Sequence, residues 1–375
     1  MNQIDNIPKD SRIAIYGAGE VGLLIKHYVE NNRPDLKIIS FFDKMPIGEV
    51  EGLTVRSIKT IAEFKADFDL VLVASYSNTA IMETILRHFG INNYAHLDNF
   101  PHYNLEDGVL AEEDSKFDDL ARVEQVQKIL SSDESKKVFD LIAKAYKSAT
   151  CFKNLANYLT EQNKQFSPNV HEQYLDFIDK DSIKTIISGG AYDAGTSLLF
   201  LDRLKNVEKI YAFEPMYENF KCEVNDSIVA ESGKVEVIQK GLFESSGELG
   251  FSENSTASRA NINPQFSHLA TSIVIKTISI DDFVKEKNIE KIDFIKMDVE
   301  GCELTALKGA QNTIRAHRPQ LAICIYHSYE ELFDIPIYLG NLLSDYRFEV
   351  YHYSLNSICE SVLYAIPDEV NSKWV

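Results

Sequence analysis

The sequence predicts an α/β protein with two Rossmann-like sheets joined by a helical connector. Strand-type runs alternate with helix-period stretches in residues 1–100 and again after residue 182, whereas residues 101–181 show helical periodicity alone. The chain also presents, twice, a strand, a glycine-rich turn that opens a helix, and a second strand that ends in an acid. We therefore predict three parts, with boundaries at 1–100, 101–181 and 182–375.

The first part carries the shorter of the two strand sets. Its helices are predicted at Val21–Asn31 and Ser77–Phe89, the second opening with the capping residues Ser77, Asn78 and Thr79. Its strands are predicted at Arg12–Tyr16, Lys37–Phe42, Leu70–Ala74 and Tyr94–Leu97. A set of about four strands corresponds to half of a doubly wound fold.

The connector is predicted to be helical because its apolar residues recur at helical spacing. One set is Leu120, Val123, Val126 and Ile129, and the next is Val138, Leu141, Ile142 and Ala145. Ser132 or Asp133 would cap the second helix. Two roles stay open, which are a structural layer packed on one or both sheets and a lid over a substrate pocket. An acidic cluster from Glu106 to Asp119 is interpreted as solvated linker.

The last part repeats the alternation and ends differently. Strands are predicted at Ile183–Ser188, Lys209–Glu214, Val235–Gln239, Ile292–Met297 and Gln320–Tyr326. The final strands, Arg347–Tyr353 and Ser361–Ile366, are joined by a short polar segment and should pair antiparallel. This ending is uncommon in dinucleotide dehydrogenases and usual in class I methyltransferases, so the second sheet is expected to be of that Rossmann-like type.

Composition excludes several classes of partner. The 375 residues carry a formal net charge of -19, distributed as -3, -6 and -10 over the three parts, which argues against binding to nucleic acid or an anionic membrane surface. The five cysteines include no CxxC pair, which favours a reducing cytoplasm. The chain shows no signal-peptide core and no run of eighteen apolar residues. The oligomeric state is left open, and a homodimer is compatible with the sequence.

The N-terminal motif IYGAGEVG places Gly17, Gly19 and Gly22 in a GxGxxG pattern between a strand and a helix. Gly17 would permit the tight turn, Gly19 the approach of a phosphate, and Gly22 close packing of the helix, while Asp43 would bind ribose hydroxyls. The alternative is that these glycines serve the turn alone. The stretch 12–55 resembles the small Rossmann-like domain of sugar-modifying acyltransferases, which implies a nucleotide or nucleotide-sugar site.

The second glycine-rich turn belongs to a larger set of features at the predicted carboxyl ends of strands, where α/β sheets bind ligands. Gly190 and Ala191 would let a cofactor lie against the backbone, and Glu214 would accept hydrogen bonds from a ribose. This arrangement suits NAD and S-adenosylmethionine equally. The full set is the turn 188–195, Glu214, the turn 240–242, Asp298 and His327.

Residues 183–353 resemble the FkbM-type methyltransferases. The resemblance rests on GAYD, FEP, the pair Ser258 and Arg259, LKGA, the IYH strand end and above all DFIKMDVEGCE, with HEQYLDFI as an approach segment. It implies S-adenosylmethionine-dependent O-methylation of sugars, glycans or polyketide-type hydroxyls. The alternatives are a nicotinamide-dependent oxidoreductase run by the N-terminal loop, and a non-catalytic sugar-nucleotide-binding protein.

The same resemblance assigns roles position by position. Glu214 would hold the ribose and Asp298 the methionine end of the cofactor. The cofactor loop would be formed by Gly190, Ala191, Tyr192 and Asp193, with Ser188, Pro215 and Gly241 completing the set. Two positions depart from the family pattern, because Ser188 stands where an acid is usual and Ala194 follows GAYD. Either departure would weaken cofactor binding or shift the loop.

The candidate catalytic residues are Asp298, His327 and Glu300. Methyl transfer from a sulfonium depends mainly on alignment, so a base only needs to take a proton late, and His327 is the best single candidate. Glu300 and Arg259 are predicted to contact the substrate. Asp298, Glu300 and Glu303 could instead gather a divalent ion, a question that the sequence leaves unknown. Glu303 could equally be a charge in the first turn of a helix.

Overall fold

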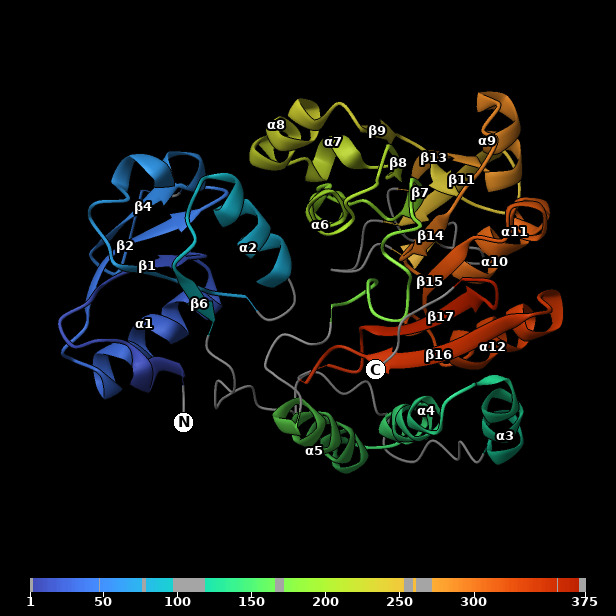
Figure 1. Ribbon diagram of the computed structural model, residues 1–375, viewed down its shortest axis with the longest axis horizontal. Helices are drawn as coiled ribbons and strands as arrows, with labels where there is room; N and C mark the ends of the chain where they lie inside the picture. The colour runs from blue at the N-terminus through green and yellow to red at the C-terminus, as the bar shows by residue number, and fades with distance from the viewer. Residues whose placement is uncertain are drawn as a thin grey trace. The chain divides into compact units, whose positions relative to one another are not determined.

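The computed structural model of the protein describes residues 3–46, 48–75, 79–96, 119–165, 172–252, 259–260, 272–355 and 357–370 (Figure 1). The chain divides into two compact units. The first comprises Met1–Tyr103, Asp193–Asp202 and Lys221–Ser232, and the second comprises Asn104–Tyr192, Arg203–Phe220 and Gly233–Val375. The fold is α/β with mixed sheets, as the alternating sequence pattern predicts.

The first unit contains a six-stranded sheet with the order β3-β4-β2-β1-β5-β6. The four predicted strands are present as β1 (Arg12–Tyr16), β2 (Lys37–Asp43), β5 (Leu70–Val73) and β6 (Tyr94–His96), all parallel. The sequence analysis missed β3 (Gly48–Val50) and β4 (Leu53–Ser57), an antiparallel hairpin that extends the sheet beyond β2. Glu51 and Gly52 both adopt positive φ angles in its two-residue turn, as a type I′ hairpin requires.

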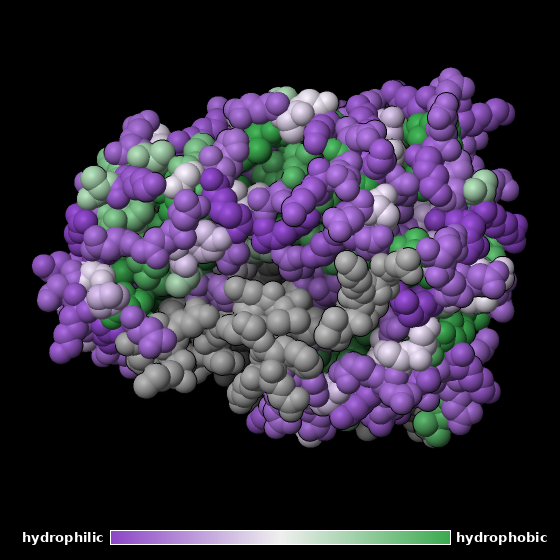
Figure 2. Space-filling model, in the orientation of Figure 1, coloured by the Kyte–Doolittle hydropathy of each residue, from purple (hydrophilic) through white to green (hydrophobic). Residues whose placement is uncertain are grey.

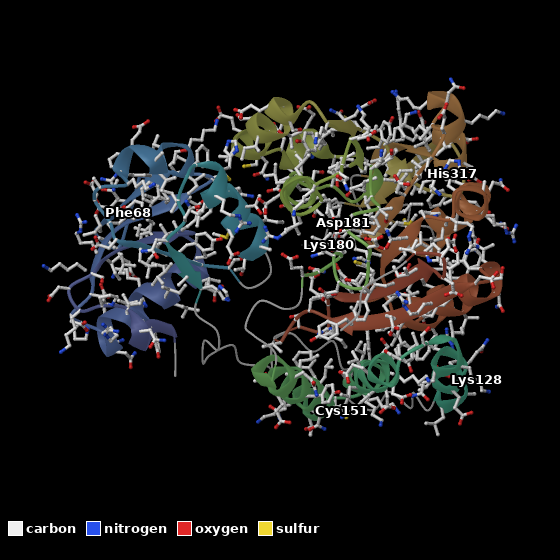
Figure 3. The ribbon with its side chains drawn as sticks, in the orientation of Figure 1. Phe68, Lys128, Cys151, Lys180, Asp181 and His317 are labelled. Atoms are coloured by element: carbon white, nitrogen blue, oxygen red, sulfur yellow. The ribbon has the colours of Figure 1, made fainter. Side chains whose placement is uncertain are left out.

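The two predicted helices of this unit are present as α1 (Glu20–Asn32) and α2 (Thr79–His88). Two 3₁₀ helices, η1 (Gln3–Asn6) and η2 (Ile58–Phe64), were not predicted. Apolar residues of α1 and of the central strands form one core, which includes Ile13, Ile15, Ile25, Val29 and Phe41. Phe68, labelled in Figure 3, is also buried and packs edge-on against Phe42. The predicted caps Ser77 and Asn78, and most of the acidic cluster 106–119, lie outside the described residues.

The second unit is built on a seven-stranded sheet with the order β16-β17-β15-β14-β7-β8-β9. The predicted strands are present as β7 (Thr185–Gly189), β8 (Lys209–Phe213), β9 (Val235–Ile238), β14 (Phe294–Met297) and β15 (Gln320–Cys324), all parallel. The predicted final hairpin is confirmed. Its second strand, β17 (Ser361–Pro367), inserts between β15 and β16 (Tyr346–His352) and runs antiparallel to both.

A four-stranded sheet with the order β10-β13-β11-β12 accompanies the large one and was not predicted. It comprises β10 (Gly241–Leu242), β11 (Gly247–Ser252), β12 (Arg259–Ala260) and β13 (Ser272–Ile278). The remaining helices are α6 (Gly195–Arg203), α7 (Tyr217–Phe220), α8 (Glu223–Ser232), α9 (Ile280–Lys287), α10 (Glu303–Lys308), α11 (Gln311–His317) and α12 (Glu331–Leu342). His317, labelled in Figure 3, is structural, because its Nδ1 accepts the backbone N–H of Ile292 at 3.1 Å.

In its described residues, 119–165 and 172–181, the connector forms the helices α3 (Leu120–Ile129), α4 (Asp133–Ala145) and α5 (Ala149–Gln165), of which α4 lies beside β16 (Figure 1). Ser132 caps α4 as predicted, because its side chain accepts the N–H of Ser135. Ser131 Oγ accepts the N–H of Phe348 at 3.0 Å, and Ser135 Oγ accepts that of Val350 at 2.9 Å. The described part of the connector therefore forms a structural layer along β16.

The face that Figure 2 displays is mostly hydrophilic, with smaller hydrophobic patches between the polar side chains. In the part of the chain that the structure describes, no helix has both the length and the apolar content needed to cross a membrane.

The core of the second unit is continuous from the connector through the sheet to α12. It includes Phe139, Phe152, Ile295, Ile323 and Phe333.

Candidate functional site

The candidate site lies where β7, β8, β14 and β15 end. These strands are parallel and adjacent, so their carboxyl ends meet at one edge of the sheet. The backbone N–H of Asp298 donates to the carbonyl of Gly189 at 3.2 Å, which joins the end of β14 to the end of β7. The sequence prediction that these features share one edge is confirmed for the turn after β7, Glu214, Asp298 and His327.

The glycine-rich turn is held by the neighbouring strand. Backbone N–H groups of Gly190 and Ala191 both donate to the carbonyl of Phe213 at 3.0 Å. Gly190 has a φ of 70°, and Tyr192 and Ala194 have φ angles of 47° and 63°. Residues other than glycine adopt this left-handed backbone region at a cost in free energy. The side chain of Asp193 accepts the N–H of Gly195 at 2.9 Å, which starts α6.

Glu214 follows β8 and braces this turn. Its Oε2 accepts the N–H of Tyr192 at 3.0 Å, and its Oε1 accepts the N–H of Met216 at 3.1 Å across Pro215. Burial raises the pKa of Glu214, although these two N–H groups and the charge of Lys296 oppose the shift. A carboxylate has about four lone-pair positions, so two acceptor positions remain for a ligand.

Asp298 is the most heavily bonded carboxylate of the site. The hydroxyl of Tyr174 donates to its Oδ2 at 2.8 Å, and that of Tyr326 donates to its Oδ1 at 3.0 Å. Burial opposes the charged form, but the positive charges of Lys296 and His327, together with these hydroxyls, outweigh it and lower the pKa of Asp298. The residue is therefore an ionised acid held in one orientation.

Lys296 is almost completely buried in β14, with 1% of its side chain exposed. Its Nζ donates to the carbonyls of Gly189 and Gly190, both at 3.0 Å, and lies 3.8 Å from Oδ2 of Asp298. In the sheet register Lys296 stands opposite Ser188, whose buried Oγ has no hydrogen-bond partner among the residues that the structure describes. Ser188 thus occupies the position where the family resemblance leads one to expect an acid. The neighbouring Lys296 has no carboxylate partner at that position and donates to the carbonyls of Gly189 and Gly190.

His327 follows β15 and is surrounded by carboxylates. Its Nε2 lies 3.4 Å from Oδ1 of Asp298 and 3.7 Å from Oε2 of Glu300, and its Nδ1 lies 3.0 Å from Oε1 of Glu303. The contact with Glu303 is an ion pair rather than an aligned hydrogen bond. Burial lowers the pKa of His327, but Glu303, Asp298 and Glu300 raise it to about 9. Burial also raises the pKa of Glu300, whose side chain is 41% exposed.

Asp298, Glu303 and His327 each offer one ligand-type atom, and these atoms lie within 4.8 Å of one another. The geometry does not assign a metal, because the carboxylates already have partners. Glu303 accepts the N–H of Val299 at 2.6 Å and that of Gly301 at 3.0 Å, and Asp298 holds the two tyrosine hydroxyls. The positive charge that an ion would supply is present as Lys296 and His327.

Other predicted site residues have a less direct placement. Gly241 lies in β10, where an added Cβ would come within 3.2 Å of the Ile275 side chain, so its role is partly packing against β13. The backbone of Arg259 lies in β12, opposite Ser252. The side chain of Arg259 and the whole of Ser258 fall outside the described residues, and the predicted substrate contact of Arg259 stays a prediction.

The N-terminal glycine loop has the geometry that the motif predicts. Gly17 has a φ of 109°, and an added Cβ at Gly22 would lie 2.0 Å from the carbonyl oxygen of Gly17. No described residue lies within 4 Å of an added Cβ at Gly19. The Asp43 carboxylate accepts the N–H of Ala18 at 2.7 Å. The structure thus has the tight turn predicted at Gly17 and the close helix packing predicted at Gly22, whereas ligand binding at Gly19 and Asp43 stays a prediction.

Sequence reasoning missed three residues that build the site, Tyr174, Lys296 and Tyr326. A lysine inside an otherwise apolar strand was the available signal for Lys296. HEQYLDFI was recognised only as a family segment, although it supplies Tyr174 with a φ of 68°. His352 is structural, because it is buried with its ring nitrogens beside Ser361 Oγ and Ser357 O.

Residues 188–350 match the sequence model of the methyltransferase FkbM domain. This match confirms the resemblance that the sequence motifs indicate for 183–353.

Three related proteins illustrate the similarity. A hexuronic acid methyltransferase, AglP of Haloferax volcanii, is 36% identical over 107 residues, which are 28% of this chain and 43% of that protein. The chain thus matches less than half the length of this curated relative. A crystal structure of methyltransferase FkbM from Methylobacillus flagellatus KT is 19% identical with a TM-score of 0.48, covering 95% of this chain and 90% of that one. Aeropyrum pernix fibrillarin with S-adenosyl-L-methionine is 12% identical, with a TM-score of 0.31 over 50% of this chain and 68% of that one.

Proposed function

We propose that the protein is an S-adenosylmethionine-dependent O-methyltransferase that acts on a hydroxyl of a sugar, a glycan or a related small molecule. The observation that carries the proposal is the convergence of the Gly190 turn, Glu214 and Asp298 at one sheet edge within an FkbM domain. The order of the seven strands, with β17 antiparallel between β15 and β16, supports the class I methyltransferase arrangement that we propose for this sheet.

Different residues would bind different parts of the cofactor. The backbone from Gly190 to Asp193 would lie along it, the free lone pairs of Glu214 would accept the ribose hydroxyls, and ionised Asp298 would attract the positively charged methionine end. Bound there, S-adenosylmethionine supplies a methyl group activated by its sulfonium. Ser188 and Ala194 do not prevent this arrangement, because Ser188 is buried behind the turn and Ala194 retains the left-handed backbone that a glycine would supply.

His327 and Glu300 would share the handling of the acceptor proton. His327 Nε2 lies between Asp298 and Glu300, and its raised pKa makes it a strong base once it has lost its own proton. Glu300 is more exposed and sits in a turn with a φ of 56°, where it could orient an acceptor hydroxyl. Alignment of acceptor oxygen, methyl group and sulfur would supply most of the rate acceleration.

A sugar acceptor is favoured by the curated relative, whose name gives a hexuronic acid as its substrate. A mass-spectrometric screen for the gain of one CH₂ across sugar nucleotides and lipid-linked or polymer-linked glycans tests this part of the proposal. A gain on a sugar hydroxyl supports it, whereas methylation confined to non-carbohydrate acceptors contradicts it.

Cofactor binding is tested separately by isothermal titration with S-adenosylmethionine. We expect saturable binding by the wild-type protein and a loss of about 10- to 100-fold in affinity for Glu214→Ala, the effect of losing charged hydrogen bonds. Glu208→Ala, at an exposed ion pair with Lys184, is the matched control and should bind normally. No heat of binding with the wild-type protein removes the assignment.

The N-terminal loop has a second candidate function, favoured by the open space at Gly19 and the position of Asp43. We propose that it holds a nucleotide or the nucleotide end of a sugar donor, in a domain of residues 1–100 joined by the 101–181 connector to the 182–375 methyltransferase part. The cytoplasm is the proposed compartment, supported by five unpaired cysteines. Fluorescence titration with NADH tests the oxidoreductase alternative, which requires saturable binding abolished by Asp43→Ala.

A further inference from the structure

Glu303, which the sequence left as a helix charge, is the most completely buried acid of the site, with none of its side chain exposed. It begins α10, and its two oxygens accept the N–H groups of Val299 and Gly301 from the turn that carries Asp298 and Glu300. The same carboxylate lies 3.0 Å from Nδ1 of His327. Glu303 therefore links the turn after β14 to the residue that follows β15.

Glu331, at the start of α12, completes this arrangement from behind. It is buried, and its Oε2 has no hydrogen-bond partner among the described residues. Burial and the neighbouring Glu303 carboxylate raise the pKa of Glu331. Two buried carboxylates in contact cannot both be ionised at low cost. Because Glu303 receives two backbone N–H groups and faces a histidine, Glu331 is the member that holds the proton.

The other ring nitrogen of His327, Nε2, faces a second group of carboxylates. Nε2 faces Asp298 from the end of β14 and Glu300 from the turn that follows. The ring of Tyr326 lies 4.2 Å from that of His327, centroid to centroid. Farther out, Lys296 lies 3.8 Å from Asp298. Burial and the charge of Asp298 raise the pKa of Glu360, in the loop before β17, and the charges of Lys296 and His327 oppose this shift. Only Nε2 is turned toward the acids expected to meet the cofactor and the acceptor.

We propose that Glu303 is the positioning residue of His327, and that Glu331 is its protonated partner in a buried Glu331–Glu303–His327 array. Glu303 would keep the Nδ1 position of His327 occupied by hydrogen, so that Nε2 is the nitrogen that exchanges a proton with the acceptor. This is the division of roles between histidine and acid known from hydrolase triads. The inference rests on the proposed methyltransferase function.

In the step that the array would serve, the acceptor O–H bond breaks and its proton passes to Nε2 of His327. The oxygen electron pair forms the new C–O bond, the S–C bond of the cofactor breaks, and its electron pair remains on sulfur. The imidazolium formed would be stabilised by the Glu303 carboxylate, which lies 3.0 Å from Nδ1. Charge and atoms balance without any further reactant.

The test is a titration of His327 by NMR in the full-length protein, with His327→Asn to assign its signal. We expect Glu303→Gln to lower the pKa of His327 by about two units, since one buried charge is removed. Glu331→Gln retains an N–H donor toward Glu303 and should leave the titration close to wild type. Asp334→Asn, on the same helix but paired with Arg122, is the matched control. If Glu303→Gln does not fold, Glu331→Leu should instead raise the pKa of His327.

Kinetics provide the second readout. Glu303→Gln should reduce kcat by about 100-fold with little change in KM for S-adenosylmethionine, and should move the pH profile to lower pH. An unchanged titration and pH profile in Glu303→Gln would overturn the proposal, as would a Glu331→Gln variant that behaves like Glu303→Gln. Absence of cofactor binding in the wild-type protein would refute the methyltransferase function alone, because the NMR titration requires no activity.

Discussion

A Cβ atom added at Gly190 would lie 1.7 Å from the carbonyl oxygen of Asp298. The turn after β7 and the end of β14 are thus in direct backbone contact, and no side chain fits between them. The hydrogen bond from the Asp298 N–H to the Gly189 carbonyl and the two bonds from Lys296 close the same junction. The predicted cofactor loop and the predicted methionine contact form one rigid piece.

This contact predicts a large effect for Gly190→Ala. The substitution must move the backbone and also occupies a φ of 70°, so we expect cofactor affinity to fall by at least about 100-fold, with a loss of several kcal/mol in stability. Gly233→Ala is the matched control, because Gly233 has a φ of 64° but nothing within 4 Å of its added Cβ. Isothermal titration and urea unfolding measure both effects. Equal behaviour of the two variants would show that the contact is unimportant.

Tyr174→Phe removes a hydroxyl that donates to Asp298. We expect the pKa of Asp298 to rise and S-adenosylmethionine to bind about tenfold more weakly, since hydrogen bonds to charged groups contribute about 1.5–3 kcal/mol. Tyr158→Phe removes an equivalent hydroxyl from Glu134 on the connector and should leave binding unchanged. Affinities from calorimetry decide the matter, and identical values for Tyr174→Phe and wild type would contradict the role of this hydroxyl.

The rate of methyl transfer should depend on pH through His327. Its pKa is raised to about 9, and only the neutral ring accepts a proton, so kcat/KM should rise about tenfold per pH unit up to that value and then level off. A profile that is already flat above pH of about 6 would point to Glu300 as the base instead. Initial rates in buffers of constant ionic strength give the profile.

Stability should fall as pH rises through the same range. The folded pKa of His327, about 9, lies above its ordinary value of 6.5, so its contribution is complete below pH 6.5 and is lost as pH rises through 9. The difference in unfolding free energy between wild type and His327→Gln should therefore shrink by on the order of 3 kcal/mol across this interval. Urea unfolding at several pH values tests this, and a constant difference would contradict it.

Two glycines of the N-terminal loop should respond differently to alanine. Gly22→Ala would place a Cβ 2.0 Å from the Gly17 carbonyl and should destabilise the unit by several kcal/mol. Gly19→Ala meets open space at a φ of -81°, so the fold should survive while any nucleotide affinity is lost. Thermal unfolding combined with NADH and sugar-nucleotide titrations separates these outcomes. Retained ligand binding in Gly19→Ala would remove the proposed phosphate contact.

The sequence predicted the parallel strands well, because each is a short, mostly apolar run, such as Arg12–Tyr16 or Ile292–Met297, of the kind that a sheet covered on both faces buries. It missed the β3–β4 hairpin and the sheet of β10 to β13. Those strands are short and mix polar with apolar residues, and only their pairing partners make them strands. Local sequence carries little of that information.

The candidate site was predicted at the level of strand ends. Asp298, Glu300 and His327 come together because parallel strands deliver their carboxyl ends to one edge. Lys296, Tyr174 and Glu331 escaped prediction because their roles depend on side-chain direction across elements up to 124 residues apart, as for Tyr174 and Asp298. The raised pKa of His327 also depends on Glu303, Asp298 and Glu300, and the spacing of these residues in the sequence does not predict their distances from the ring.

The helical connector has a consequence for the behaviour of the protein in concentrated solution. β16 is an outermost strand of the seven-stranded sheet, and such strands offer unpaired backbone groups to neighbouring molecules. Here the N–H groups of Phe348 and Val350 are taken by Ser131 and Ser135, and the Phe348 carbonyl accepts the N–H of Ser131. α4 thus blocks strand addition along this edge, so the connector protects the methyltransferase sheet against aggregation as well as joining it to the first domain.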